Sequence, residues 1–185
     1  IPYKEAVLPF LYKIDPVAEA VGAVNCIRII EGKCYGYNTD STGFEQSLSP
    51  LLKASHPKAL VLGSGGSSKA VQYVLTKKGI EFLIVTSSDK HTGKYIQYRQ
   101  ISEALLQEYP VIINCTPVGM SPNVHEYPQL PYEFLSEKNL LFDLIYSPSK
   151  TKFLQLGEER GATVKNGFEM LVLQAEENWK IWNAL

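Results

Sequence analysis

A glycine-rich segment near the middle of the chain has the residue types of a phosphate-binding turn. The run LVLGSGGSSKAV, from Leu60 to Val71, reads as a buried strand, a tight turn and the start of a helix. Free backbone N–H groups and the helix dipole at such a turn favour a pyrophosphate. Gly63 permits the turn, and Gly65 and Gly66 leave room for a phosphate because they carry no Cβ. The pattern is GxGG rather than GxGxxG, so a purely structural strand-to-helix turn is the alternative.

Other polar residues have ordinary interpretations when they are considered one at a time. Lys4, at the edge of a helix, is typical of a solvated surface charge, and Asp40, before a helix, is typical of an N-cap. Asn25 at a strand start commonly supports a turn. Gln174 fits the solvated face of the last helix, and Tyr146 fits packing at a strand end. The residues alone leave these alternatives open.

The composition indicates a globular protein and argues against several other classes. Of 185 residues, 45% are hydrophobic and 20% are charged, which is enough for a proper core. A net charge of −1 gives no field that would attract nucleic acid or acidic membranes. Three scattered cysteines without a CxxC pair argue against a disulfide framework or a metal site and fit a reducing cytoplasm. No apolar run approaches the roughly 18 residues of a membrane span, and no signal peptide is visible.

The first part of the chain predicts a small unit of mixed structure. Asp15 and Pro16 form a helix-start signal, and Glu31 to Lys33 form a turn between two β-branched runs. In chain order we expect a helix over residues 4–12, a helix from residue 16 to before Gly22, a hairpin of strands 24–30 and 34–38, and a helix capped by residue 39 or 40 and ending near 53.

From residue 58 the pattern changes to strands that alternate with helices. We expect strands over 59–62, 82–86, 110–114, 140–144 and 162–164, and helices over 67–78, 102–107, 151–160 and 167–182. The strands are almost continuously apolar, which is typical of a parallel sheet covered on both faces. The predicted fold class is therefore α/β, with a doubly wound, Rossmann-like nucleotide domain preceded by an incomplete α/β substrate domain.

Motifs in a characteristic order run along nearly the whole chain. They are IPYKEAV, GAVNCI, GYNTDSTGF, LVLGSGGSSKAV, NCTPVGMSP, FDLIYSPSKT and NGFEMLVLQAEENWKIW. Together they resemble the shikimate dehydrogenase family, whose members interconvert 3-dehydroshikimate and shikimate with a nicotinamide cofactor. The resemblance implies an NADPH-dependent oxidoreductase of aromatic amino-acid biosynthesis that acts on a small molecule.

The resemblance implies catalytic roles for Lys4 and Asp40, which match the family's catalytic lysine and aspartate. Reduction of a ketone by hydride needs a proton at the developing alkoxide, and a lysine ammonium can supply it and stabilise the charge. A carboxylate beside the ammonium would hold it in place. We therefore expect the two side chains to face one another close to the nicotinamide.

The resemblance also assigns residues to the substrate and to the cofactor. Asn25, Tyr146 and Gln174 are the expected substrate contacts. The expected cofactor contacts within the turn and the later loops are Gly63, Ser64, Gly65, Gly66, Ser67, Thr116, Pro117, Gly167 and Met170. Thr116 and Pro117 follow a strand of the α/β unit, at the edge where open α/β sheets bind ligands.

The residues expected at the adenosine end depart from the family pattern. NADP-dependent members carry an arginine after the second strand, where this chain has Thr86-Ser87-Ser88-Asp89-Lys90. Ser87, Ser88 and Lys90 can hold a 2′-phosphate, although less firmly than a bidentate arginine. An acid such as Asp89 suits the ribose hydroxyls of NAD instead. We expect NADP, with NAD as the alternative and an NAD-using quinate/shikimate dehydrogenase as the alternative enzyme.

The start of the chain departs from the family pattern as well, because family members carry further substrate-domain residues before the IPYKEAV motif. We expect residues 1–40 to be the remainder of that domain, 41–166 the dinucleotide-binding domain, and 167–185 a helix that returns to the substrate domain. This chain alone is then expected not to be a competent dehydrogenase, and to be a monomer or homodimer. A non-catalytic dinucleotide-binding module is the rival interpretation, against which Lys4, Asp40 and Gln174 argue.

Overall fold

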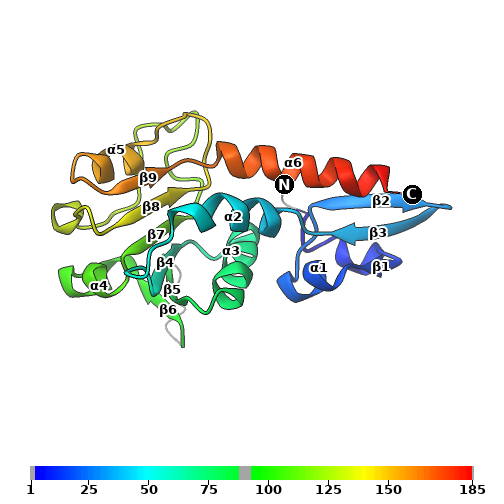
Figure 1. The fold of residues 1–185 in the computed structure, drawn as a ribbon, viewed down its shortest axis with the longest axis horizontal. Coiled ribbons are helices and arrows are strands. Elements are labelled where there is room, and N and C mark those ends of the chain that lie inside the picture. The colour runs from blue at the N-terminus through cyan, green and yellow to red at the C-terminus, as the bar shows by residue number, and fades with distance from the viewer. Residues whose placement is uncertain (1–2, 88–92, 185) are drawn as a thin grey trace.

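The computed structural model describes residues 3–87 and 93–184, and these residues form two sheets (Figure 1). The smaller sheet has the strand order β1-β3-β2. Its strands are β1 (Lys13–Ile14), β2 (Cys26–Ile30) and β3 (Lys33–Tyr37), with helix α1 (Pro16–Val21) between β1 and β2. The predicted hairpin is confirmed by the antiparallel pairing of β2 with β3, and β1 adds a parallel strand on the other side of β3.

The predicted helix over residues 4–12 is wrong. Residues 3–7 form turns, and a short 3-10 helix, η1 (Leu8–Phe10), follows them. Pro9 lacks a backbone N–H and its ring clashes with the preceding turn, so an α-helix cannot continue through it. The chain then extends into β1, which the sequence pattern did not indicate. Lys4 consequently lies in a turn, where its carbonyl accepts a 2.8 Å hydrogen bond from the Val24 N–H.

The larger sheet is parallel throughout, and its first strand in chain order lies in the middle of the sheet. Its strand order is β6-β5-β4-β7-β8-β9. The strands are β4 (Lys58–Leu62), β5 (Glu81–Thr86), β6 (Tyr95–Gln97), β7 (Val111–Asn114), β8 (Leu140–Asp143) and β9 (Thr163–Lys165). The chain changes direction between β4 and β7, and doubly wound sheets bind ligands in the crevice outside the carboxyl ends of strands at such a point. All of these strands except the short edge strand β6 were predicted.

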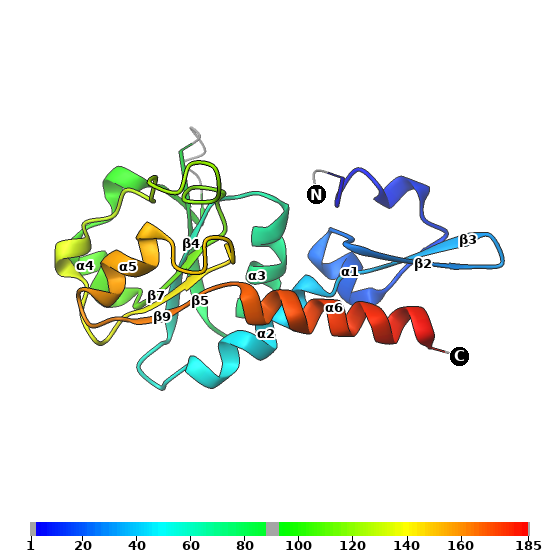
Figure 2. The ribbon, with the colours of Figure 1, turned by 90° about the horizontal axis from the view of Figure 1, so that it is seen from above.

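Helices cover both faces of the larger sheet (Figures 1 and 2). One face is covered by α2 (Asp40–Leu48), α3 (Gly66–Lys77) and α6 (Phe168–Asn183), and the other by α4 (Glu103–Glu108) and α5 (Lys152–Glu158). Strand β4 shows the division clearly: Ala59 and Val61 pack with α2, α3 and α6, whereas Leu60 and Leu62 pack with α4 and α5. Because successive side chains of a strand point to opposite faces, an apolar run is buried on both sides. The doubly wound α/β fold is thus confirmed.

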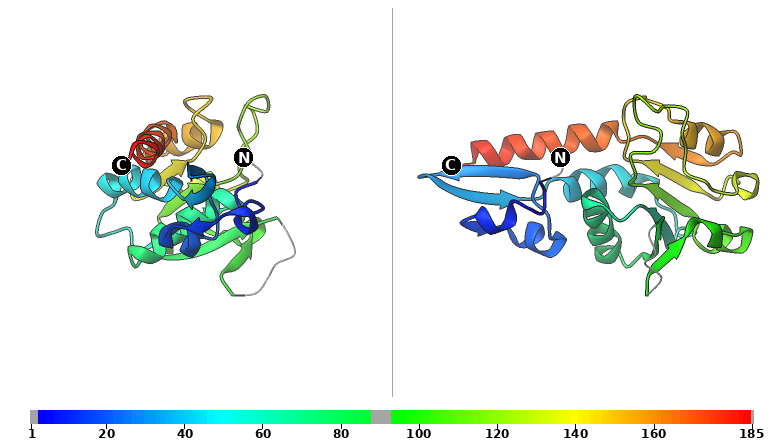
Figure 3. Two further views of the ribbon diagram at one scale, coloured as in Figure 1. Left: turned by 90° about the vertical axis from the view of Figure 1, so that its right-hand side faces the viewer. Right: turned by 180° about the vertical axis from the view of Figure 1, so that it is seen from behind.

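Helices α2 and α6 lie side by side and lead from the larger sheet toward the smaller one (Figure 2). Gly43 lets them approach closely, because a Cβ there would lie only 2.6 Å from the Met170 carbonyl oxygen. Farther along α6, the Trp182 indole donates a 3.1 Å hydrogen bond to the Ile27 carbonyl of β2. Figure 3 shows the smaller sheet at the end of the molecule opposite α4 and α5. Helices α2 and α6, which carry the predicted site residues Asp40 and Gln174, therefore connect the two sheets.

Short 3-10 helices complete the described structure. Helix α2 ends at Leu48 rather than near Lys53, because Pro50 lies in η2 (Ser49–Leu51), directly after it. The others are η3 (Tyr98–Gln100) and η4 (Tyr132–Phe134). Among the helices of the described residues, none combines the length and the apolar character needed to cross a membrane.

Candidate active site

A pocket of about 300 Å³ opens where the smaller sheet meets α2, α3 and α6. Segments that are distant in the sequence contribute to it, including the turn around Lys4, the start of each of these helices and the loop after β8. The lining residues are Lys4, Asn25, Asp40, Ser67, Leu144, Tyr146, Gly167, Met170, Leu171 and Gln174. Only Leu144 and Leu171 among them are absent from the residues that the sequence analysis assigned to the site.

Lys4 and Asp40 form an ion pair in this pocket. The Lys4 ammonium donates a hydrogen bond to Oδ2 of Asp40, and their side chains are 19% and 11% exposed. Asp40 is the first residue of α2, where the helix dipole stabilises a carboxylate. Lys4 is fixed on its main-chain side by the bond to Val24. The fold thus brings together the two residues that the sequence analysis expected to face one another.

Asn25 links this ion pair to α6. Its Nδ2 donates to Oδ1 of Asp40 at 2.9 Å and lies 3.4 Å from Oε1 of Gln174. Its Oδ1 accepts a 2.8 Å hydrogen bond from the backbone N–H of Thr39. That backbone donor fixes the orientation of the amide, so that its NH₂ group faces the carboxylate. Asn25, Asp40 and Gln174 therefore form one connected polar group in the wall of the pocket.

Thr39 and Asn178 extend this network and were not predicted. The Thr39 hydroxyl, which is almost completely buried, donates to Oδ1 of Asn178 at 2.8 Å. Nδ2 of Asn178 donates to Oε1 of Gln174 at 3.2 Å. The available signal was spacing, since Asn178 lies one helical turn after Gln174 on the same face of α6. The sequence predicted residue 39 or 40 as the cap of α2. The Asn38 side chain takes this part instead, because its Oδ1 accepts a hydrogen bond from the backbone N–H of Ser41.

The glycine turn between β4 and α3 has the conformation that its sequence predicts. Gly63 has a φ of +96°, and a Cβ there would lie 2.8 Å from Cγ2 of Thr116. Gly65 precedes α3, and the described residues provide no side-chain cap at this helix end. A Cβ at Gly65 would meet nothing within 4 Å, so the turn is open on this side. An open, uncapped helix N-terminus fits a pyrophosphate, and Ser67 in its first turn lines the pocket.

A buried polar network ties together the loops that follow β7 and β8. Asp143, which is fully buried, accepts hydrogen bonds from Asn114 Nδ2 at 3.0 Å, the Ile145 N–H at 3.0 Å and the Thr151 hydroxyl at 2.6 Å. Burial raises the pKa of the Asp143 carboxyl from 3.8 to about 6, although these bonds oppose the shift. Asn114 Oδ1 in turn accepts from the backbone and hydroxyl of Thr116. The network holds the loop of Thr116 against the loop that leads to Tyr146.

Comparisons with known proteins identify the family of this chain. A scan against family models finds none that matches the chain. The NADP(+) shikimate dehydrogenase of Halothermothrix orenii is 35% identical over 100% of this chain and 71% of its own length. This protein belongs to the shikimate dehydrogenase family. Among solved structures, shikimate 5-dehydrogenase of Thermus thermophilus, in complex with NADP(H) and shikimate, matches with a TM-score of 0.86 at 30% identity, covering 100% of this chain and 71% of that one. The ligand-free 5-ketofructose reductase of Gluconobacter sp. strain CHM43 matches with a TM-score of 0.82 at 30% identity, covering 100% and 72%.

The remaining residues that the shikimate dehydrogenase resemblance assigned to the cofactor lie along the carboxyl edge of the larger sheet. Gly167 is packed against the Leu144 carbonyl so closely that a Cβ would collide with it. The Thr116 hydroxyl donates to Asn114 at 2.6 Å, and Pro117 beside it is exposed. Ser87 is exposed immediately after β5. The expected contacts Ser88 and Lys90 lie outside the described residues, as does Asp89.

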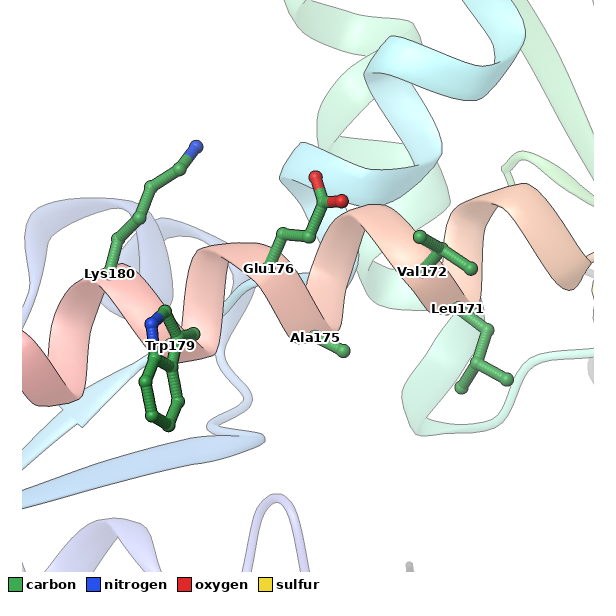
Figure 4. A pocket seen from close by; sticks show the side chains of 6 residues that line it. All are labelled: Leu171, Val172, Ala175, Glu176, Trp179 and Lys180. Carbon is green, nitrogen blue, oxygen red and sulfur yellow. The ribbon is translucent and has the colours of Figure 1, made fainter.

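A second and larger hollow lies on α6, away from the ion pair. Its volume is about 640 Å³, and it is lined by Leu171, Val172, Ala175, Glu176, Trp179 and Lys180. Figure 4 shows that all six side chains come from this one helix. The hollow is open and mainly apolar. Its charged lining residues are Glu176 and Lys180, and it lacks the amide groups and the residue of the glycine turn that line the smaller pocket. The chemistry of the family therefore points to the pocket of Lys4 and Asp40 as the candidate active site.

Proposed function

We propose that this protein reduces the ketone of 3-dehydroshikimate to shikimate with NADPH and catalyses the reverse oxidation. The observation that carries the proposal is the Lys4–Asp40 ion pair in a pocket whose wall includes the first turn of α3. A proton donor is thereby adjacent to a turn that fits a dinucleotide. The names of the similar proteins, which are NADP(+) shikimate dehydrogenases, support the same reaction.

The bound nicotinamide would supply the hydride, and Lys4 would supply the proton. As hydride reaches the carbonyl carbon, negative charge develops on the oxygen, and an ammonium group can stabilise it and donate a proton to it. Asp40 holds the ammonium in a fixed direction, because its Oδ2 accepts a bond from Lys4 while its Oδ1 accepts one from Asn25. In the oxidation direction the neutral amine of Lys4 would take the proton back from the hydroxyl.

The amide groups of the pocket suit a polyhydroxylated ring. Asn25 and Gln174 each carry both a donor and an acceptor. In this structure these groups are bonded to one another and to neighbours such as Asp40, and ring hydroxyls could replace some of these partners. Tyr146 is half exposed at the mouth of the pocket and offers a further hydroxyl. Leu144, Met170 and Leu171 form the apolar part of the lining and would exclude water from the hydride path.

For the cofactor we propose that the pyrophosphate lies on the turn from Gly63 to Ser67 and that NADP is preferred to NAD. The turn offers backbone donors at an uncapped helix end. Ser87 follows β5 at the edge where the adenosine ribose of a doubly wound fold binds, and Ser88 and Lys90 follow it in the sequence. A hydroxyl pair and a lysine favour a phosphate over a free ribose hydroxyl.

We further propose that residues 41–166 form the nucleotide-binding domain, whereas 1–40 and 167–185 form the substrate side. The three-stranded sheet and the far end of α6 support this division. The Arg28 guanidinium donates to the Ala184 carbonyl, and Trp182 bonds to Ile27, so α6 returns to β2. Both residues of the catalytic ion pair would then lie on the substrate side, and Asp40, as the first residue of α2, would place the pair at the boundary between the two units.

Steady-state turnover with matched substrates tests the proposed reaction in a protein that carries this chain together with the further substrate-domain residues of the family, because the chain alone is expected not to be a competent dehydrogenase. We expect NADP-dependent oxidation of shikimate to exceed that of quinate, and reduction of 3-dehydroshikimate to exceed that of 5-ketofructose. Quinate oxidation that is faster with NAD would favour the alternative enzyme, and faster reduction of 5-ketofructose would assign a different substrate. Tight binding of NADPH with no turnover of any of these compounds would instead favour a non-catalytic dinucleotide-binding module.

A further inference from the structure

An ion pair between Glu5 and Lys69 lies beside the glycine turn and has no role in the reaction described above. Lys69 Nζ is 2.6 Å from Oε2 of Glu5, and the two side chains are 36% and 52% exposed. Lys69 belongs to the first turns of α3, and Glu5 directly follows Lys4. The other carboxylate oxygen of Glu5 lies 3.8 Å from the position that a Cβ of Gly66 would take. A carboxylate therefore stands next to the helix end that fits a pyrophosphate.

A bound pyrophosphate would interact favourably with some of the charges at this turn and unfavourably with others. A pyrophosphate on the turn would be attracted by the helix end and by the Lys69 ammonium, and it would be repelled by Glu5. Glu5 is half exposed, and Lys69 is its ion-pair partner among the described residues. If Lys69 turned toward the phosphate, Glu5 would be free to move into solvent. Lys69 can therefore form a close ion pair either with Glu5 or with the pyrophosphate, but not with both at once.

We propose that Lys69 is a cofactor-binding residue that exchanges Glu5 for the dinucleotide pyrophosphate. This inference rests on the proposed dinucleotide site. Because such coupling is reciprocal, any change that frees Lys69 from Glu5 must strengthen cofactor binding by the factor with which the cofactor weakens the pair. The segment that carries Lys4 would consequently be held by α3 in the free protein and released from this contact when the cofactor binds.

A double-mutant cycle, with NADPH binding measured by titration calorimetry, tests the exchange. We expect Lys69→Met to weaken NADPH binding by about 2- to 5-fold, the size of one solvent-exposed charge contact. Glu5→Gln should tighten it by about 2- to 5-fold in the parent protein, because the competitor for Lys69 is lost. In the Lys69→Met background, Glu5→Gln should have almost no effect, because nothing then holds the carboxylate at the turn. Lys77→Met is the matched control, since Lys77 pairs with Glu45 at 2.7 Å at the far end of the same helix.

NADH provides the second arm of the experiment. It shares the pyrophosphate but lacks the 2′-phosphate, so each variant should change the dissociation constants of NADPH and NADH by the same factor. An effect confined to NADPH would assign Lys69 to the 2′-phosphate and overturn the proposal. If Glu5→Gln tightened dinucleotide binding equally with and without Lys69, Glu5 would act only by repelling the pyrophosphate, and the proposal would also be overturned. If the parent protein binds both dinucleotides and no variant alters either constant, only the exchange fails; if it binds neither, the proposed cofactor site fails first.

Discussion

Lys4 owes its position to contacts on both sides of its Cα. Its carbonyl is bonded to Val24, and its ammonium to Asp40, which is itself bonded by Asn25. An acid that is held in this way loses little freedom when it donates a proton, and fixed geometry is a large part of its usefulness. The turn conformation of residues 3–7 directs the Lys4 side chain to Asp40 at the start of α2.

Replacing Lys4 by alanine should therefore reduce turnover far more than cofactor binding. In a protein that also carries the further substrate-domain residues of the family, we expect kcat for shikimate oxidation to fall by about 10²–10⁴-fold, since the proton donor is lost. The dissociation constant of NADPH should change little, because the glycine turn is untouched. Lys13→Ala, at an exposed lysine of β1, is the control and should retain parental kcat. Near-parental turnover of Lys4→Ala would refute the assignment of Lys4 as the donor.

Asp143 should make stability depend on pH. Its pKa is about 6 in the folded protein and 3.8 ordinarily, so between these values the native state retains a proton that the unfolded chain has lost. Stability should accordingly fall as pH rises from about 4 to 6, by about 3 kcal/mol at about 1.4 kcal/mol per unit. Asp143→Asn keeps an acceptor for Asn114 and Ile145 and has no charge to bury. Relative to the parent, the variant should gain this amount in urea unfolding between pH 4 and pH 7; parallel curves would contradict the prediction.

At the scale of elements, the contact of α2 with α6 sets the distance between Asp40 and Gln174. Gly43 stands at the crossing, and a Cβ there would lie 2.6 Å from the Met170 carbonyl and 3.1 Å from the Gln174 N–H. Gly43→Ala would gain about 1 kcal/mol of helix propensity but lose about 1–3 kcal/mol to overpacking against backbone that cannot yield. We expect a net loss of up to about 2 kcal/mol in urea unfolding and a larger loss of kcat than of NADPH affinity.

Gln46→Ala is the control for this crossing, because Gln46 is exposed on the same helix. It should leave both unfolding and turnover close to parental values. A Gly43→Ala protein that is more stable than its parent would mean that α6 can move away from α2 without cost. Retained kcat in that variant would mean that Gln174 does not depend on this packing.

Periodicity and turn chemistry predicted most of the elements, and the exceptions have physical causes. The apolar runs around Val61, Ile113 and Phe142 are long enough to indicate buried parallel strands. Strand β6 is three residues long and only partly buried, so its sequence carries little signal. Pro9 and Pro50 were each visible, but their effect on a helix that otherwise reads well was underestimated. Pro50 only changed where a helix ends, whereas Pro9 removed a predicted helix and β1 and β6 were missed; none of these errors changes the α/β fold.

The sequence predicted only those site residues that belong to a recognisable motif. The glycine turn has a conformational reason that is visible in the residues themselves, and Gly63 shows the expected positive φ. Lys4 and Asp40 look like a surface charge and an N-cap until the resemblance to the family is considered. Thr39 and Asn178 were missed because each matters only through a partner that the fold supplies. Spacing places Asn178 one turn after Gln174 on α6, but it cannot reveal that Thr39, before α2, is bonded to Asn178.

At the scale of the whole molecule, burial is distributed unevenly between the two sheets. The larger sheet has extensive apolar clusters on both faces, whereas the cluster beside the smaller sheet is built around Val21, Ala23 and Ala70. Several large apolar side chains near the smaller sheet are exposed, among them Phe10, Tyr12 and Ile29. Regions with few buried contacts open at lower free energy than the core. The half of the molecule that carries Lys4 is thus expected to be the less stable half.

The two tryptophans allow this difference to be measured directly. Both Trp179 and Trp182 lie on the part of α6 that runs along the smaller sheet, and Trp182 is bonded to β2. Circular dichroism at 222 nm reports on all helices, including α6, and therefore gives α2, α3, α4 and α5 on the larger sheet more weight than tryptophan emission does. In urea we expect tryptophan emission to change at a lower midpoint than the dichroism, and NADPH to raise the dichroism midpoint more than the emission midpoint. The NADPH effect follows because the glycine turn belongs to the larger sheet. Coincident midpoints that shift together would show that α2 and α6 unite both sheets in one cooperative unit, and the uneven distribution of burial would then have no thermodynamic consequence.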